Sequence, residues 1–200
     1  MDQLRLADMT DEQLASAYIG GNNRAFDLLL QRNKTKLFTY ICFVVRNTDV
    51  ANDIFQDTFV KVIVRMHNGE YKPSGKFSAW IMRIAHNIIM DRFRNEQNEG
   101  IVEIENDNDM SLLEGDDISD APVEVSFVNE QVLTDVKHLM EELPPVQREV
   151  VFMRYFQEMS FKEIAEATGV SINTSLGRMR YAVINLRRMI RHHNLELQLA

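Results

Sequence analysis

The sequence predicts an all-α protein in which two small helical domains are joined by a flexible acidic linker, the second domain containing a helix-turn-helix. Three observations predict this architecture. Apolar residues recur at spacings of three and four on both sides of the chain's middle, Gly and Pro are confined to expected helix boundaries, and acidic residues are concentrated in one segment. The length of 200 residues, with 45% hydrophobic content, is enough for one medium domain or for two small ones that each bury a core.

The net charge of −8 is distributed unevenly along the chain. Residues 1–94 carry 13 Lys/Arg and 10 Asp/Glu, residues 95–127 carry 11 Asp/Glu and no Lys or Arg, and residues 128–200 carry nine of each sign. The middle segment lacks sustained helical periodicity and is rich in acids, Asn and Gly, so we predict a linker there. This linker is either a solvated tether or a negatively charged strand held by a basic channel or domain. Because the acidity lies mostly in the linker, the overall charge does not argue against nucleic-acid binding.

The first domain, residues 1–94, is expected to contain five helices. Thr10 and Gln13 form a capping-box pattern that opens the first helix, which is expected to end near Gly20. The remaining helices are expected from about Asn23, through the apolar run LFTYICFVV, over residues 50–66 and over residues 77–94.

The second domain, residues 128–200, is expected to begin with a helix over 128–142 and a second one that reaches about Phe156. Ser160 and Glu163 then form another capping box, and Gly169 supplies the left-handed conformation that ends the helix. Ser171 can cap the next helix after a turn of about three residues, which is the connection typical of a helix-turn-helix.

The last helix is expected to be two-faced. At about 100° per residue, one side contains the residues expected to face the core: Ile172, Ser175, Met179, Ala182, Val183, Leu186 and Ile190. The other side contains Asn173, Thr174, Gly177, Tyr181 and Arg188, with Arg178 and Arg180 on the flanks. Short polar groups and a glycine suit close approach to base edges, and arginines suit phosphates, so the pattern favours binding in the major groove. The alternative is an ordinary amphipathic helix with a solvated face.

The helix over residues 50–66 is also two-faced. Ala51, Ile54, Phe55, Phe59, Val62 and Met66 form an apolar side, and Asp53, Gln56, Asp57, Val60 and Val64 lie opposite. Two valines are unexpected on a solvated face, so this side either contacts a partner or is buried within the bundle.

The helix over residues 77–94 has a second stripe at helical spacing, formed by Lys76, Trp80, Arg83, Asn87, Asp91 and Arg94. Basic and amide groups beside an aromatic ring suit single-stranded nucleic acid, because cations contact phosphates and rings stack on exposed bases. The alternative for Trp80 is that it packs in the core.

The sequence indicates no catalytic, metal or cofactor site. Asp53, Asp57 and Asp91 are candidate metal ligands for phosphoester chemistry, but the chain has no HExxH, no Gly-rich phosphate loop and no activated nucleophile. Cys42 is the only cysteine and lies in an apolar run, so we expect it to be a small buried hydrophobic residue. With neither a signal peptide nor an apolar stretch long enough to span a bilayer, we expect a cytoplasmic protein without membrane insertion.

Two motif blocks resemble a known family. In the first domain, D-x-x-Q-D-x-F from Asp53 to Phe59 and F-S-x-W-I-x-R-I-A-x-N-x-x-x-D-x-x-R from Phe77 to Arg94 are similar to region two of extracytoplasmic-function (ECF) sigma factors. In the second domain, LPPVQREVVFMRY followed by the helix-turn-helix resembles their region four. The resemblance covers nearly everything except the linker, and two blocks in the right order are more specific than either alone.

This resemblance implies a transcription initiation factor that binds core RNA polymerase and directs it to promoters. Asp53, Gln56, Asp57 and Val60 would meet the polymerase. The loop YKPSGK and the stripe would capture the opened minus-ten element, through Lys76, Trp80, Arg83, Asn87 and Arg94. The last helix would read the minus-thirty-five duplex, through Ser171, Asn173, Thr174, Gly177, Arg178, Arg180, Tyr181 and Arg188. The resemblance also implies that the protein is a monomer in the free state and that an anti-sigma factor, which can be membrane-tethered, binds it. It further implies that the linker follows the polymerase's basic RNA path.

Two positions depart from the family pattern. Family members often carry basic residues where Leu176 and Tyr181 stand, so the promoter sequence read by this helix is expected to differ. The competing functions are a dimeric helix-turn-helix repressor or activator, which would protect palindromic half-sites, and the metal-dependent enzyme considered above.

Overall fold

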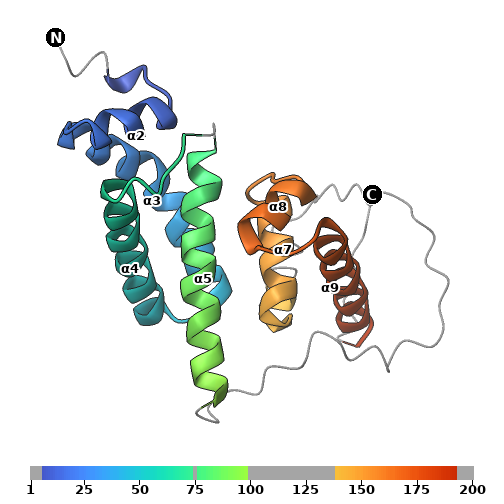
Figure 1. Ribbon diagram of the computed structural model, residues 1–200. Coiled ribbons are helices and arrows are strands. Elements are labelled where there is room, and N and C mark those ends of the chain that lie inside the picture. Colours follow the sequence, from blue (N-terminus) through green and yellow to red (C-terminus); the bar gives the residue numbers. More distant parts are fainter. Residues whose placement is uncertain (1–5, 74–75, 99–137, 193–200) are drawn as a thin grey trace.

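The computed structural model describes residues 6–73, 76–98 and 138–192, and every regular element within these ranges is an α-helix (Figure 1). The first domain contains α2 (Asp11–Ile19), α3 (Asn23–Val45), α4 (Thr48–His67) and α5 (Phe77–Asn98). The second contains a short helical segment over residues 138–142, then α7 (Pro145–Tyr155), α8 (Phe161–Thr168) and α9 (Ile172–His192). Helix α5 continues four residues past its expected end at Arg94, and the rest of the predicted linker lies outside the described residues.

Helix α3 corrects one expectation, because the second and third helices expected from the sequence are a single continuous helix. The polar stretch QRNKTK separates the two apolar runs in the sequence, but it contains neither Gly nor Pro to stop a helix. Two of its polar residues bind α2 instead. Arg32 Nη1 lies 3.1 Å from Asp11 Oδ1, and the buried Asn33 donates to Asp11 Oδ2 at 2.9 Å.

Both predicted capping boxes are confirmed. The backbone N–H of Gln13 donates to Thr10 Oγ1, and the backbone N–H of Thr10 donates to Gln13 Oε1, at 3.3 and 2.8 Å. Ser160 and Glu163 make the equivalent pair at the start of α8, with distances of 3.3 and 2.9 Å. Helix α8 ends at Gly169, whose φ of 70° lies in the left-handed region as expected.

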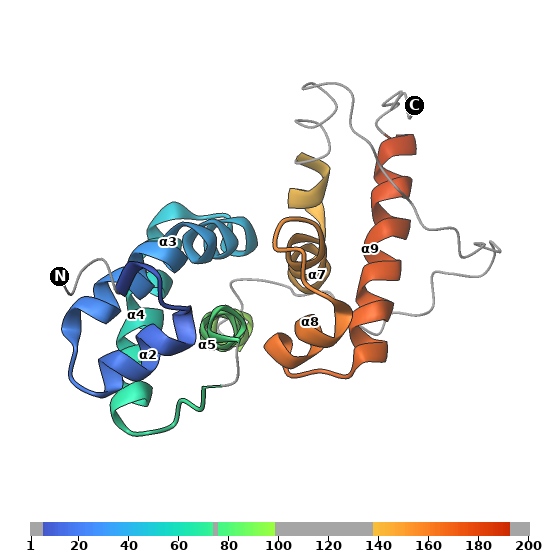
Figure 2. The same cartoon turned by 90° about the horizontal axis from the view of Figure 1, so that it is seen from above.

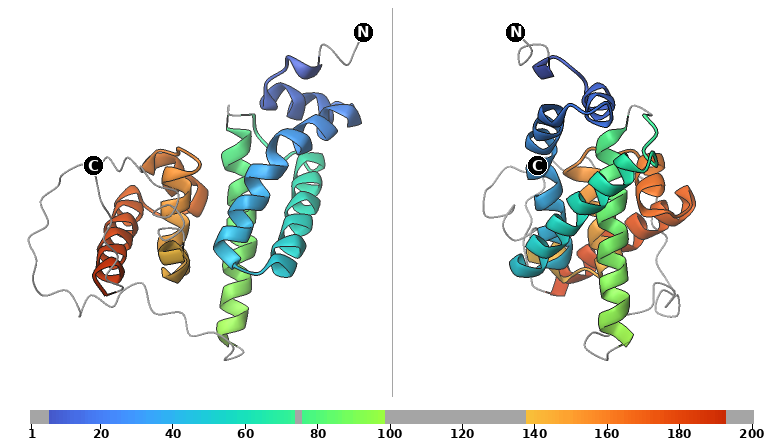
Figure 3. Two further views of the ribbon diagram at one scale, coloured as in Figure 1. Left: turned by 180° about the vertical axis from the view of Figure 1, so that it is seen from behind. Right: turned by 60° about the vertical axis from the view of Figure 1, so that its left-hand side comes forward.

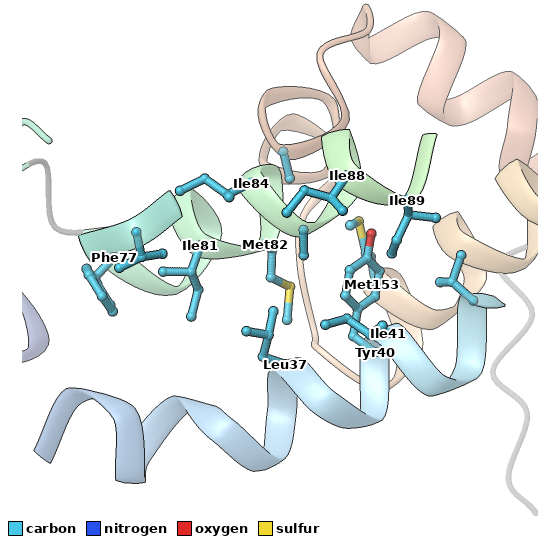
Figure 4. Packing of buried hydrophobic residues seen from close by; sticks show 14 of the residues in the cluster. Leu37, Tyr40, Ile41, Phe77, Ile81, Met82, Ile84, Ile88, Ile89 and Met153 are labelled. Carbon is cyan, nitrogen blue, oxygen red and sulfur yellow. The ribbon is translucent and has the colours of Figure 1, made fainter. Parts of the chain in front are cut away.

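The first domain is a bundle in which α3 packs on α2, α4 and α5. Figure 4 shows Leu37 and Ile41 of α3 directed toward Ile81 and Met82 of α5, and all four side chains are buried. The backbone N–H at the start of α5 is satisfied from another helix, since Phe77 N donates to Glu12 Oε1 at 3.0 Å.

The two domains pack against each other rather than standing apart. Helix α7 lies against α3, and α8 lies against α5. Helix α5 therefore lies between the other helices of the first domain and the helix-turn-helix (Figures 2 and 3). The buried apolar side chains accordingly form one cluster that runs from the first domain to Phe152 and Met153 of α7.

Cys42 is half-buried rather than buried, which corrects the expectation for this residue, and partial burial raises the pKa of its thiol. Within the described residues, no helix has the length and apolar character that a bilayer span requires.

Candidate nucleic-acid interface

The turn between α8 and α9 is closed by a hydroxyl cap. Ser171 Oγ accepts a hydrogen bond from the backbone N–H of Thr174 at 3.0 Å, as the sequence predicts for an N-cap. The Ser171 and Thr174 hydroxyl oxygens also lie 2.8 Å apart. Both hydroxyls are therefore engaged with each other at this turn.

The face of α9 opposite its buried residues is open. Ser175, Met179 and Ala182 are buried, in agreement with the expected core side. The residues expected to meet DNA are exposed or half-buried: Ser171, Asn173, Thr174, Arg180 and Arg188 are exposed, and Gly177, Arg178 and Tyr181 are half-buried. A Cβ added at Gly177 would meet no described atom within 4 Å, so the packing does not require a glycine there. An external surface that approaches the backbone would explain it.

Two apolar side chains at the start of α9 are exposed. Ile172 was expected to face the core, but 46% of it is exposed, and Leu176 is 43% exposed. Ile172 is the first residue of the helix, and because Cα–Cβ bonds tilt toward the N-terminus, its side chain projects past the helix end. At helical spacing, Leu176 lies beside Ile172, Asn173 and Arg180, within the surface expected to meet DNA.

The outer face of α4 is exposed, so the alternative of burial on both sides is wrong. Val60 is 59% exposed and Val64 51% exposed, and they share the face with the exposed polar residues Asp53, Gln56 and Asp57. The inner face is buried as expected, except that Phe55 is half-buried against the rings of Phe38 and Phe59.

The stripe on α5 is exposed at Lys76, Arg83, Asn87, Asp91 and Arg94. Lys76 Nζ lies 3.2 Å from Glu166 Oε2 on α8, and Arg94 Nη1 lies 3.0 Å from Asp91 Oδ1.

Trp80 is half-buried, and its ring centroid lies 4.6 Å from that of Tyr71 and 5.9 Å from that of Phe77. Burial, and then the charges of Glu12 and Asp11, raise the pKa of Tyr71 to about 12, so this phenol stays neutral beside the tryptophan. The ring is therefore held by aromatic neighbours but is not enclosed.

Sequence reasoning missed a polar cluster at the contact between the domains. Tyr40 of α3 donates its hydroxyl hydrogen to Glu149 Oε1 of α7, and His86 Nδ1 of α5 lies 2.7 Å from the same oxygen. All three residues are buried. Burial, followed by the charge and hydrogen bond of Glu149, raises the pKa of Tyr40 well above its usual value. The available signal was polar residues inside apolar runs, IAHNII and REVV, but nothing in the sequence pairs them.

Next to this cluster, Arg148 is buried and fixes the start of α7. Its guanidinium donates to the backbone oxygens of Val44 and Leu143, at 2.9 Å each. Burial and the nearby charge of Arg46 lower the pKa of Arg148 to about 10, against an opposing effect of Glu141, so it remains a cation near neutral pH.

The described residues contain no group of three or more His, Cys, Asp or Glu side chains arranged to hold a metal ion.

Two family models match the chain. Residues 29–99 match Sigma-70 region 2, which spans most of α3 through α5. Residues 133–175 match Sigma-70, region 4, which spans α7, α8 and the start of α9.

Individual proteins agree with these matches. The chain is 30% identical over 172 residues to a probable RNA polymerase sigma factor of Haemophilus influenzae, covering 80% of this chain and 88% of that protein. It is 25% identical over 173 residues to the ECF RNA polymerase sigma factor SigW of Bacillus subtilis, covering 86% and 91%. The sigma factor RpoE of Bartonella quintana, solved in complex with the anti-sigma factor NepR, has the same fold, with a TM-score of 0.60 and 20% identity over 83% of this chain and 96% of that one.

Proposed function

The chain belongs to the ECF-type RNA polymerase sigma factors, and we propose that its two domains divide promoter binding between the helix faces described above. As a sigma factor it binds core RNA polymerase, directs it to promoters and is not an enzyme. In the proposed division, residues 1–94 bind polymerase and the minus-ten element, and residues 128–200 bind the minus-thirty-five element. The linker is residues 95–127, of which the first four continue helix α5 to Asn98.

The outer face of α4 is the proposed polymerase contact, formed by Asp53, Gln56, Asp57 and Val60. The observation that supports it is the exposure of Val60 and Val64 beside two carboxylates, because a partner would remove the valines from water and could offer basic groups to the carboxylates. The double substitution Asp53→Ala with Asp57→Ala is expected to lower affinity for core polymerase and leave the helical content unchanged. Asp27→Ala, an exposed carboxylate on α3, is the matched control. Unaltered co-purification of the double variant with core enzyme would remove these residues from the contact.

The α5 stripe is the proposed site for the opened minus-ten strand, through Lys76, Trp80, Arg83, Asn87 and Arg94. The exposed amide of Asn87 and the guanidinium of Arg83 can contact base edges and phosphates, and the partly open ring of Trp80 can stack on a base. A base that leaves the duplex stack costs a few kcal/mol, and these contacts would offset that cost.

The exposed side of α9 is the proposed reader of the minus-thirty-five duplex. Arg178, Arg180 and Arg188 would contact phosphates, Asn173 and Tyr181 would reach base edges, and Gly177 would allow close approach. Ser171 and Thr174 would act through the cap, which holds the helix N-terminus in place. The open space around Gly177 supports this assignment.

An anti-sigma factor is the proposed regulator. The Bartonella quintana neighbour was solved with such a partner, and this chain exposes apolar side chains on both faces that would be covered, Val60 on α4 and Leu176 on α9. We propose that the protein is cytoplasmic and is a monomer when free, and that the anti-sigma factor can be tethered to the membrane.

Run-off transcription tests the whole assignment. Purified core RNA polymerase with and without this protein would be given a genomic fragment library. Discrete new transcripts whose starts share two upstream elements are expected. Transcripts that appear only with another sigma factor present, together with palindromic footprints, would instead identify a dimeric regulator.

A further inference from the structure

The start of α5 is held by a side chain from another helix. The residue immediately before α5 is Lys76, whose ammonium group only donates hydrogen bonds and so cannot cap the N–H groups at a helix start. Glu12 of α2 supplies an acceptor instead, since Phe77 N donates to its Oε1 atom at 3.0 Å. We propose that Glu12 is a positioning residue for capture of the opened minus-ten strand, because it fixes the first turn of α5 and with it Trp80. This inference rests on the proposed function.

The Glu12 carboxylate belongs to a helix that is firmly bound to α3. The preceding residue contacts α3 twice, since Asp11 Oδ1 lies 3.1 Å from Arg32 Nη1 and Asp11 Oδ2 accepts a hydrogen bond from Asn33 at 2.9 Å. Arg32 also donates to two backbone oxygens of the segment before α2, at 2.7 and 2.6 Å. Figure 1 shows that α2 lies at the same end of the first domain as the start of α5. Helix α2 therefore connects α3 to the first turn of α5.

The charge of Glu12 suits this place. Helix α5 has 22 residues, and the aligned peptide dipoles of a helix favour a negative charge at its N-terminus. A hydrogen bond to a carboxylate is also stronger than one to a neutral acceptor. Because a helix N-terminus attracts phosphates too, a carboxylate fixed there excludes the DNA backbone from the helix end. The strand is then left to the exposed side chains along the stripe, such as Arg83 and Asn87.

Packing links Phe77 to Trp80. The backbone N–H of Trp80 donates to the carbonyl oxygen of Lys76 at 3.0 Å, which closes the first turn of α5. The ring centroid of Phe77 lies 5.9 Å from that of Trp80 and 5.6 Å from that of Tyr71. Phe77 and Tyr71 are buried, whereas Trp80 is half-buried. A change at the first turn would therefore move the ring that is proposed to stack on a base.

Tyr71 lies near the same carboxylate but is not part of this contact. Its hydroxyl is buried and has no hydrogen-bond partner among the described residues. Burial, and then the charge of Glu12, raise the pKa of Tyr71 to about 12. Removal of the hydroxyl keeps the ring and leaves the bond from Phe77 N to Glu12 in place, so Tyr71→Phe is a control in the same neighbourhood.

Two substitutions separate the reach of Glu12 from its charge. Glu12→Gln keeps an acceptor oxygen at the same place along the side chain but removes the charge. Glu12→Asp keeps the charge but is one methylene shorter, so its carboxylate is not expected to reach Phe77 N. Since the hydrogen bond is proposed to position α5, Glu12→Ala and Glu12→Asp should behave alike, and Glu12→Gln should stay close to the parent. Asp8→Ala, which removes an exposed carboxylate from the segment before α2, is the matched control.

The fluorescence of Trp80 measures the surroundings of its ring in the free protein. Trp80 is the only tryptophan of the chain, so its emission is observed without contributions from others. Glu12→Ala is expected to shift the emission to longer wavelength and to increase quenching by acrylamide, because the ring becomes more accessible to water. Glu12→Gln and Asp8→Ala are expected to leave both quantities near their parent values. Unchanged emission and quenching in Glu12→Ala and Glu12→Asp would overturn the positioning of Trp80 by Glu12.

Strand binding by the assembled holoenzyme measures the consequence for function. The probe is a fluorescent single-stranded oligonucleotide that contains the minus-ten sequence of a promoter recovered by run-off transcription. Glu12→Ala is expected to weaken its binding on the order of tenfold, because loss of a hydrogen bond to a charged group lowers the fraction of molecules whose α5 is competent to bind. Affinity for core polymerase should not change, since the outer face of α4 is untouched.

The outcomes distinguish this inference from the proposed function. Equal strand binding by the parent, Glu12→Ala and Glu12→Asp would overturn the role of Glu12, and so would equal losses of strand and polymerase binding, which indicate only a less stable fold. If Glu12→Ala fails to fold, Glu12→Asp has the same expected results. Tyr71→Phe should bind the strand as the parent does. A parent protein that gives no run-off transcript would instead count against the proposed function, and the Trp80 fluorescence would still test the role of Glu12.

Discussion

His86 Nδ1 lies 2.7 Å from Glu149 Oε1, and this buried contact joins α5 of the first domain to α7 of the second. Neither side chain belongs to the proposed DNA or polymerase faces. Residues so far apart in the sequence are joined only because the two domains dock.

A double-mutant cycle is expected to show that these two residues are energetically coupled. His86→Ala and Glu149→Ala each remove one partner and leave the other buried, so the double variant should cost less than the sum of the singles, with a coupling of about 0.5–3 kcal/mol. Urea unfolding of the four proteins measures it. The cycle of His86→Ala with Glu158→Gln should be additive. Additivity in the first cycle as well would mean that the contact does not form in solution.

Val60→Glu is expected to weaken binding to core polymerase. If Val60 is covered in the complex, the loss of its apolar burial corresponds to about 1.5–3 kcal/mol. Because Val60 is 59% exposed, the unfolding free energy should barely change. Titration of fluorescently labelled protein with core enzyme gives the affinity. Arg24→Glu, at an exposed position of α3, is the control, and an equal effect there would indicate a general charge effect.

Arg180→Ala is expected to weaken duplex binding at every sequence and to flatten its salt dependence. Loss of one phosphate contact reduces counterion release, so the slope of log K against log salt should fall by about one. Binding to promoter fragments over a salt series checks this, with Arg24→Ala as the control. An unchanged slope would remove Arg180 from the phosphate contacts.

Leu176→Ser is expected to change base preference rather than overall affinity. An exposed leucine in the major groove can contact the methyl group of thymine, and such burial is worth about 0.8 kcal/mol per carbon. Each thymine of the minus-thirty-five element would be replaced in turn by uracil, which lacks only that methyl. One replacement should weaken binding of the parent protein and leave Leu176→Ser unaffected. If no uracil duplex separates the two proteins, Leu176 does not read a methyl group.

Ser160→Ala removes the cap of α8 and is expected to cost about 0.5–2 kcal/mol of unfolding free energy. Thermal or urea unfolding measures the loss, and Ser78→Ala, at the second residue of α5, is a serine-to-alanine control. Equal losses in both variants would argue against the capping role.

The same cap gives a pH dependence. Hydrogen bonds from the Ser160 backbone and hydroxyl lower the pKa of Glu163, so its contribution to stability is present above the usual carboxyl pKa and is lost as the pH falls through the lowered value. Between about pH 7 and pH 3, the protein should lose more stability than Glu163→Gln does. The difference should be small, because Glu163 is partly exposed. An identical pH dependence in the two proteins would contradict the assignment.

The helices and their ends were largely predictable, because their signals are local. The capping boxes at Thr10 and Ser160 and the left-handed stop at Gly169 involve residues only a few positions apart. The one merged helix, α3, was misread because the polar stretch around Asn33 resembles a break. The Asn33 amide in fact donates to Asp11 of α2, which no local pattern reveals.

The outer face of α4 and the open face of α9 were predictable from helical periodicity, but the state of particular side chains was not. Periodicity placed Ile172 toward the core, whereas its position at the helix start leaves it exposed. Whether Val60 faced solvent or another helix depended on how many neighbours pack around α4.

The sequence by itself determined the helices, the helix-turn-helix and the family, because these follow from spacing, capping and motifs read along the chain. Only the tertiary structure decided that the two domains share one buried cluster and that Tyr40, His86 and Glu149 meet within it. Tyr40 and Glu149 are 109 positions apart, and His86 and Glu149 are 63 apart. A contact over such separations forms because docking of α7 on α3 and α5 buries apolar surface, and no pattern along the chain specifies which polar groups that docking brings together.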